Sequence, residues 1–177
     1  MNLTLSEIEQ ACGGHIVYRG ASPDQKVSCV DVDSRKVMAD GVFLATVGER
    51  VDGHRFIQEV FEKGAALVIT TKTPSLVEQE HGIEPDAWRS YLVVEDTFDA
   101  LKRIGETYRK KLKIPVVGIT GSVGKTSTKE YIAGVLSQKY RVLKTDGNYN
   151  NEIGVPLTIL RIRNEHTAAV IEMGISD

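Results

Sequence analysis

The segment that most constrains the fold is a continuous apolar run at 115–120 (PVVGIT), followed at once by the glycine-containing stretch GSVGKTS. Apolar runs of this kind are typical of parallel strands covered on both faces. After the glycines, Ile132, Val135 and Leu136 recur at helical spacing. A strand, a glycine turn and a helix in this order predict an open α/β sheet, because parallel strands are joined by crossover helices.

The glycine stretch has the residue types of a phosphate-binding loop. Glycines allow the backbone to curl so that N–H groups face an anion, and the following helix adds its positive end. Lys125 is placed to reach the β and γ phosphates, and the Thr126 hydroxyl to ligate Mg²⁺. The common pattern G-x-x-x-x-G-K-[ST] is not met, because Ile119 occupies its first position. The alternative is a glycine turn beside a surface lysine. The strand and helix around the loop favour ATP with Mg²⁺, and the residues expected to bind the nucleotide are Gly121, Ser122, Val123, Gly124, Lys125, Thr126 and Ser127.

Three further places carry polar residues that need an explanation. Glu172 ends the apolar strand expected at 168–174, where an unpaired carboxylate is costly to bury, so Mg²⁺, a salt bridge or solvent must meet it. The segment TDGNYNNEIGVP is a loop whose asparagines either cap their own backbone or present amides to a polar substrate; they are Asn148, Asn150 and Asn151. Ser34 and Arg35, with Asp33, form either an anion or uracil-edge site or a local ion pair at a strand end.

The first half of the chain also alternates between strand and helix patterns. Thr4 and Glu7 have capping-box spacing and predict an opening helix. The patterns that follow predict strands at 26–35, 41–46, 65–70 and 91–94, a helix at 54–64, a turn-rich stretch at 71–90 and an amphipathic helix at 97–113. We therefore expect a small α/β domain at 1–94 and the first part of an open-sheet, phosphate-loop domain at 95–177.

Composition narrows the classes of function. The chain has 177 residues, 41% of them hydrophobic and 26% charged, which is the balance of a folded globular protein. The net charge of −2 gives no excess of positive charge that would attract a nucleic acid or an anionic membrane. No window reaches the roughly 18 apolar residues of a membrane span, and the N-terminus has no secretory pattern. We expect a cytoplasmic protein that neither inserts into membranes nor binds nucleic acid.

The pieces DSR, GERVDGH, GITGSVGKTS, GNYNNEIGVP and VIEMG, in this order through nearly the whole chain, resemble the Mur ligase family. The resemblance implies a three-domain protein whose second domain is cut short here. It implies catalytic roles for Lys125 and Glu172, and Mg²⁺ held by Thr126 and Glu172. Val123 stands where many family members have Asn. The residues implied near the UDP-linked substrate are Ser34, Arg35, Asp52 and His54, and those implied at the shared substrate and nucleotide cleft are Asn148, Asn150 and Asn151.

The resemblance also implies an ATP-dependent amide ligase that works through an acyl phosphate, and a monomer when complete. GNYNNEIGVP is most similar to the branch that joins D-alanyl-D-alanine to UDP-N-acetylmuramoyl-tripeptide. The branch that adds the third amino acid shares the DSR and DGH pieces and stays open. Two other classes are a small-molecule kinase and a non-catalytic module for a UDP-sugar, whereas a GTPase is disfavoured because no N-K-x-D segment occurs. We expect these 177 residues alone not to catalyse ligation.

Overall fold

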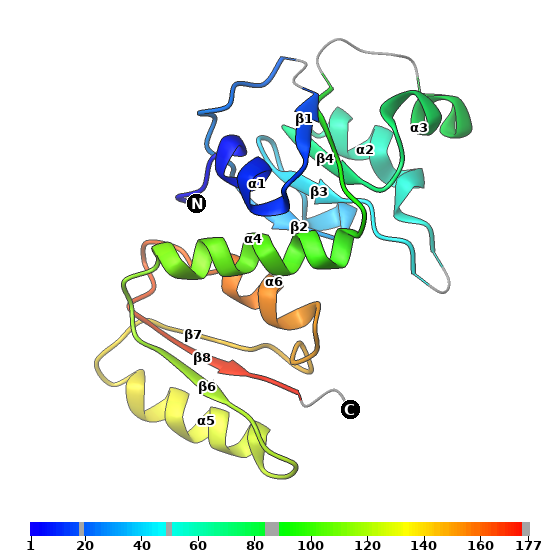
Figure 1. Cartoon of the computed structure of the whole chain (residues 1–177). Coiled ribbons are helices and arrows are strands. Elements are labelled where there is room, and N and C mark those ends of the chain that lie inside the picture. Colours follow the sequence, from blue (N-terminus) through cyan, green and yellow to red (C-terminus); the bar gives the residue numbers. More distant parts are fainter. Residues whose placement is uncertain (18–19, 49–50, 84–88, 175–177) are drawn as a thin grey trace. The chain divides into compact units, whose positions relative to one another are not determined.

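A computed structural model describes residues 1–17, 20–48, 51–83 and 89–174 of the chain. The chain forms two compact units, Met1–Ile104 and Gly105–Asp177, and each contains a sheet with parallel strands (Figure 1). The expected α/β class is therefore confirmed. The domain boundary at 94/95 stays a prediction, because helix α4 (Thr97–Lys111) runs through the point where the units divide. Within the described part of the chain, no helix combines the length and the apolar character that a membrane crossing requires.

The first unit is built on a five-stranded sheet with the strand order β1-β5-β4-β3-β2. Its strands are β1 (His15–Val17), β2 (Val30–Asp31), β3 (Val42–Leu44), β4 (Leu67–Thr70) and β5 (Tyr91–Val93). Strands β2 to β5 are parallel, and β1 pairs antiparallel with β5. The carboxyl ends of β2 and β3 thus meet at one edge of the sheet, which is where open α/β sheets bind ligands.

Helices cover both faces of this sheet. The helical elements are α1 (Leu5–Cys12), η1 (Ser34–Lys36), η2 (Gly53–Phe56), α2 (Ile57–Glu62), α3 (Pro74–His81) and α4. In Figure 1, α1 lies on one side of the strands and α2 and α3 lie on the other. The core on the α2 and α3 side includes Phe43, Val60 and Val77, all fully buried. The expected capping box is present, with Thr4 Oγ1 accepting from Glu7 N–H and Glu7 Oε2 accepting from Thr4 N–H.

The second unit has a three-stranded parallel sheet in the order β6-β8-β7. Its elements are β6 (Val116–Ile119), α5 (Lys125–Leu136), β7 (Val142–Lys144), α6 (Gly154–Leu160) and β8 (Ala168–Glu172). Figure 1 shows α5 and α6 on opposite sides of the three strands. The C-terminal half of α4 belongs to this unit, where the Tyr108 hydroxyl donates to the Ile162 carbonyl oxygen at 2.6 Å. This bond ties the C-terminal half of α4 to the segment that follows α6.

Three local expectations are wrong. The strand at 115–120 is less buried than its apolar run predicts: among the described strands β6 pairs only with β8, which leaves one edge open, and its Gly118 is exposed, whereas all five residues of β8 are buried. The stretch 71–90 contains helix α3, because Pro74, taken as a turn residue, opens the helix at a position where its missing N–H costs nothing. The asparagine loop ends earlier than expected, since α6 begins at Gly154.

Candidate functional site

The loop between β6 and α5 leaves the first turn of a helix open to an anion. Gly121 has φ +144° and Gly124 has φ +78°, in the region that favours glycine, so the chain turns sharply out of β6 and into α5. Gly124 is the N-cap of α5, and no side chain caps it. The side chain of Val123 points away and is 90% exposed. The backbone N–H groups at the start of α5 are therefore available to a ligand, and the helix dipole favours a negative one.

Lys125 is folded back across this loop. Its ammonium donates to the Gly121 carbonyl oxygen at 2.6 Å, and the residue is half-buried. This hydrogen bond links the two ends of the loop. A bound phosphate oxygen would replace the Gly121 carbonyl oxygen as the acceptor of the ammonium.

Glu172 is a charged group almost fully enclosed beside the loop. It ends β8 and is 2% exposed, which excludes a solvated strand end. The Thr126 hydroxyl lies 3.3 and 3.2 Å from its Oε1 and Oε2, and Asn150 Nδ2 donates to Oε1 at 2.8 Å. Burial alone would raise the pKa of Glu172, but hydrogen bonds from Asn150, Lys129 and Thr126 outweigh it and hold this pKa below its usual range. The carboxylate is therefore charged and fixed in orientation at neutral pH.

The three asparagines of the loop after β7 have separate positions. Asn150 reaches Glu172, as described, while Asn151 Oδ1 accepts from the Gly154 N–H at 2.8 Å and so supports the start of α6. Asn148 is exposed. One asparagine thus caps its own backbone, as the first account expects, and another contacts Glu172. The role of each toward a ligand stays a prediction.

Lys129 and Thr145 belong to this cluster and were not among the predicted residues. Lys129 Nζ lies 3.4 Å from Glu172 Oε2, and Thr145 Oγ1 accepts from the Glu172 N–H at 2.9 Å. A signal for Lys129 was available: it follows Lys125 by four residues, so the two lysines lie on one side of α5, on a helix that must turn one side to the sheet. Nothing comparable in the sequence pointed to Thr145.

In the first unit, a cavity of about 890 Å³ opens at the carboxyl ends of β2 and β3. Ser34 and Arg35 line it, together with Thr46, Gly53 and Phe56. Asp33 shapes this wall by accepting from the Arg35 backbone N–H at 3.1 Å and from its guanidinium at 2.9 and 2.8 Å. The Arg35 hydrogen bonds lower the pKa of Asp33 to about 2. The local ion pair is therefore present, with the Arg35 side chain 84% exposed, and an anion site at this residue stays a prediction.

Asp52 and His54 lie beside this cavity but do not line it. His54 is fully buried, with Nδ1 2.5 Å from Asp52 Oδ1 and Nε2 2.8 Å from Thr70 Oγ1. Burial acts to raise the pKa of Asp52, yet the bonds from His54 and the charge of Lys72 hold it below its usual value. This pair fixes the turn that presents Gly53 to the cavity. Glu49 and Arg50, from the same sequence piece, lie outside the described residues.

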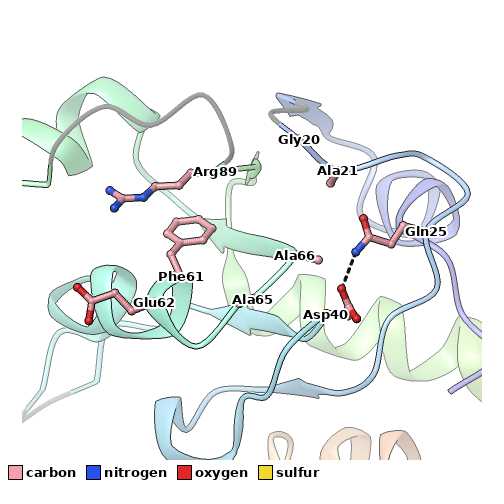
Figure 2. A pocket seen from close by; sticks show the side chains of 10 residues that line it. Gly20, Ala21, Gln25, Asp40, Phe61, Glu62, Ala65, Ala66 and Arg89 are labelled. Carbon is pink, nitrogen blue, oxygen red and sulfur yellow. Dashed lines mark hydrogen bonds between the residues drawn. The ribbon is translucent and has the colours of Figure 1, made fainter.

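A second cavity of about 410 Å³ lies at the amino ends of the strands, near Gly64, Ala65 and Ala66. Figure 2 shows the Arg89 side chain beside the Phe61 ring, with the guanidinium carbon 5.6 Å from the ring centre, and Gln25 donating to Asp40 at 3.0 Å. Open α/β sheets bind ligands at the carboxyl ends of their strands, so the cavity lined by Ser34 and Arg35 is the better candidate for a nucleotide-linked substrate.

The oxygen ligands at the loop fit Mg²⁺. Thr126 and Glu172 supply one hydroxyl and one carboxylate, which are the hard donors that this ion prefers. No group of three or more His, Cys, Asp or Glu side chains that could hold a metal occurs among the described residues. A site with two protein ligands is typical of Mg²⁺ that is also held by phosphates and water.

Comparison with known proteins identifies the family. Residues 26–109 match the model of the Mur ligase family catalytic domain, and residues 119–177 match that of the Mur ligase middle domain. The chain belongs to the Mur ligase family. Both the candidate substrate cavity and the candidate nucleotide loop fall within these Mur ligase regions.

Curated relatives among the Mur ligases share one name, UDP-N-acetylmuramoyl-tripeptide--D-alanyl-D-alanine ligase. The protein from Bacillus subtilis (strain 168) is 40% identical over 83% of this chain and 30% of its own length. The protein from Synechocystis sp. is 43% identical over 86% of this chain and 32% of its own length. The protein from Escherichia coli (strain K12) is 35% identical over 98% of this chain and 35% of its own length. The chain thus spans about a third of the length of these relatives.

Solved Mur ligase structures agree with the fold. MurF from Acinetobacter baumannii superposes with a TM-score of 0.79 at 35% identity, covering 97% of this chain and 36% of that one. MurF from Thermotoga maritima, solved in complex with ADP, gives a TM-score of 0.68 at 34% identity over 84% of this chain and 32% of that one.

Proposed function

We propose that this chain is part of an ATP-dependent ligase that joins D-alanyl-D-alanine to UDP-N-acetylmuramoyl-tripeptide, a step of peptidoglycan precursor synthesis. The observation that carries the proposal is the meeting of Thr126 and the buried Glu172 beside an uncapped helix start, in a chain 35–43% identical to enzymes of that name. The cytoplasmic location and the monomeric state remain predictions from the family resemblance.

The chemical problem defines what the protein must supply. An amine does not displace oxide from a carboxylate, so the carboxylate oxygen of the tripeptide first attacks the γ-phosphorus of ATP and ADP leaves. The resulting acyl phosphate is attacked by the amine of D-alanyl-D-alanine. Phosphate then leaves, and the nitrogen loses a proton. Negative charge accumulates on phosphate oxygens in the transition state of the first step. An enzyme lowers the barrier mainly by neutralising this charge.

The loop residues are suited to neutralising the charge of the phosphates. Lys125 would release the Gly121 carbonyl and bind the β and γ phosphates, while the N–H groups of residues 121–127 surround the same phosphates. Mg²⁺ bound here would supply positive charge that offsets the negative charge of the phosphates. Thr126 and Glu172 would hold it, and Asn150 would keep Glu172 in orientation. These positions are fixed within one unit, so the site needs little rearrangement on that side.

The cavity in the first unit is proposed to bind the UDP end of the precursor. Ser34 is 6% exposed and supplies a rigid wall, whereas the Arg35 side chain is 84% exposed and would exchange part of its pairing with Asp33 for an anionic diphosphate. Phe56 adds an aromatic surface to the lining. Asp52 and His54 would act through the turn at Gly53, because the His54 ring itself is enclosed.

The test is an acceptor experiment on the whole ligase of which this chain is proposed to be a part, called the intact protein below. Purified protein receives Mg-ATP, UDP-N-acetylmuramoyl-tripeptide and D-alanyl-D-alanine, and the product is sought by mass spectrometry. In a parallel reaction, UDP-N-acetylmuramoyl-dipeptide replaces the tripeptide precursor, and free diamino acids replace D-alanyl-D-alanine. We expect the pentapeptide in the first reaction and no product in the second. The reverse result would assign the protein to the branch that adds the third amino acid, and ATP turnover without ligation in either would remove the proposal.

A further inference from the structure

Lys129 is a buried cation. Its side chain is 2% exposed, and it lies on α5 with Nζ 3.4 Å from Glu172 Oε2. Removing a lysine ammonium from water costs several kcal/mol unless an opposite charge is close by. Lysine rarely occupies such a position without a partner. The site chemistry described above makes no use of Lys129, so its burial needs a reason.

The charges around Lys129 alternate from the surface inward. Lys144 on β7 pairs with Glu130 Oε2, Glu130 Oε1 lies 3.6 Å from Lys129 Nζ, and Lys129 meets Glu172. Two positive and two negative groups balance along this row. Glu130 is about half exposed and screened by solvent, whereas Lys129 and Glu172 are both 2% exposed. The inner pair is therefore the strongly coupled one.

The two oxygens of Glu172 have different neighbours. Oε1 accepts from Asn150 at 2.8 Å, while Oε2 faces Lys129 at 3.4 Å, and Thr126 lies at similar distances from both. Asn150 is neutral, so only Oε2 faces a cation in this cluster. A divalent ion that approaches Thr126 and Glu172 would meet the positive charge of Lys129 next to one of its ligand atoms.

We propose that Lys129 is the counter-ion and positioning residue of Glu172: it balances and orients the carboxylate before metal arrives, and it competes with the metal for Oε2. The inference rests on the Mg²⁺ site of the proposed function. Without Lys129 the metal-free site would hold an uncompensated buried carboxylate. With it, the site is formed in advance, and metal binds less tightly than two oxygen ligands alone would allow.

The first test is a double-mutant cycle without metal, in the intact protein. Lys129→Met and Glu172→Gln are each expected to raise the unfolding equilibrium constant by about 100-fold or more, because each takes from a buried charge its closest partner of opposite charge. The double variant removes both charges and should be destabilised much less than the sum. Lys139→Met, which replaces an exposed lysine just past the end of α5, is the control and should change little. Additive effects of Lys129→Met and Glu172→Gln would overturn the pairing.

The second test measures Mn²⁺ binding by electron paramagnetic resonance in the presence of ADP. Loss of a competing cation should make Lys129→Met bind Mn²⁺ on the order of tenfold more tightly than the wild type. Lys129→Arg keeps the charge and should resemble the wild type. A side chain that only fills space would lower stability without changing Mn²⁺ affinity, so equal affinities of wild type and Lys129→Met overturn the inference. Failure of the wild type to bind any Mn²⁺ overturns the proposed metal site and with it the competition, whereas the metal-free cycle tests the pairing by itself.

Discussion

The candidate sites of the two units differ in how much of their geometry is fixed before a ligand arrives. In the second unit, Glu172 is 2% exposed and is held by Thr126, Asn150 and Lys129. In the first unit, the Arg35 side chain is 84% exposed beside a cavity of about 890 Å³. Phosphoryl transfer needs charges in place before the reaction. Recognition of a large, flexible substrate tolerates side chains that become ordered on binding, at a cost in affinity.

The largest effect is expected when the positive charge of Lys125 is removed from the phosphate-loop site of the second unit. Lys125→Ala should lower the rate of phosphoryl transfer on the order of 10³-fold, because one positive charge is lost where transition-state charge accumulates. Binding of the UDP-linked precursor to the first unit should not change. Rapid-quench measurement of the acyl phosphate, with Lys139→Ala just past the end of α5 as the control, checks this. Acyl phosphate formed at the wild-type rate would mean that Lys125 has no part in the chemistry.

Much of this contrast could be anticipated from the residues. The run before Gly121 and the helical spacing after Lys125 predicted the turn that opens the first turn of α5, and that geometry is present. The carboxylate at Glu172 was expected to need a partner, since the strand around it is apolar. Local patterns suffice in these cases because each feature depends on residues adjacent in the chain.

The parts that could not be predicted depend on contacts between distant segments. Thr145 meets the Glu172 N–H across 27 residues of chain, and His54 meets Thr70 across 16. The burial of β6 was overestimated because an apolar run does not state how many neighbours a strand has. Pro74 and Gly154 were taken as turn residues, although each lies at the start of a helix. Residue type alone does not separate a turn from the first residue of a helix.

The second prediction concerns the buried support of the open site. His54→Ala should lower the free energy of unfolding by about 3 kcal/mol, because Asp52 and the buried Thr70 lose their partner and a cavity forms. His15→Ala, which removes an exposed ring, should cost little. Urea denaturation of the intact protein, followed by a probe in the first unit, measures both. An effect of His54→Ala as small as that of the control would show that the ring does not hold the turn at Gly53.

The third prediction tests the open site directly. Arg35→Ala should weaken binding of the UDP-linked precursor about tenfold, the size expected for one charge-assisted contact. Binding of ATP should remain as in the wild type, because Arg35 lies in the other unit. Isothermal titration of both ligands decides the matter, with Lys26→Ala as a control that removes an exposed positive charge outside the residues that line the cavity. Equal losses for the two ligands would mean that Arg35 supports the fold instead of the substrate.

The smallest expected effect is a dependence of stability on pH that arises from the same arginine. The pKa of Asp33 falls from 3.8 to about 2 in the folded protein, first through hydrogen bonds from the Arg35 side chain. A carboxylate whose pKa is lowered by folding stabilises the fold above the unfolded pKa, and this contribution is lost as the pH falls toward the folded value. The loss should therefore occur between about pH 4 and pH 2. It should be small, because the Arg35 side chain is largely exposed and solvent screens the pair.

Urea midpoints of the intact protein, measured at intervals through this range, should fall more steeply with acid in the wild type than in Arg35→Ala. Asp33→Asn removes the titrating group and should show the same shallower slope as Arg35→Ala. If both variants kept the wild-type slope, the acid sensitivity would have to come from another carboxylate, and the pair at the mouth of the cavity would contribute nothing measurable to the fold.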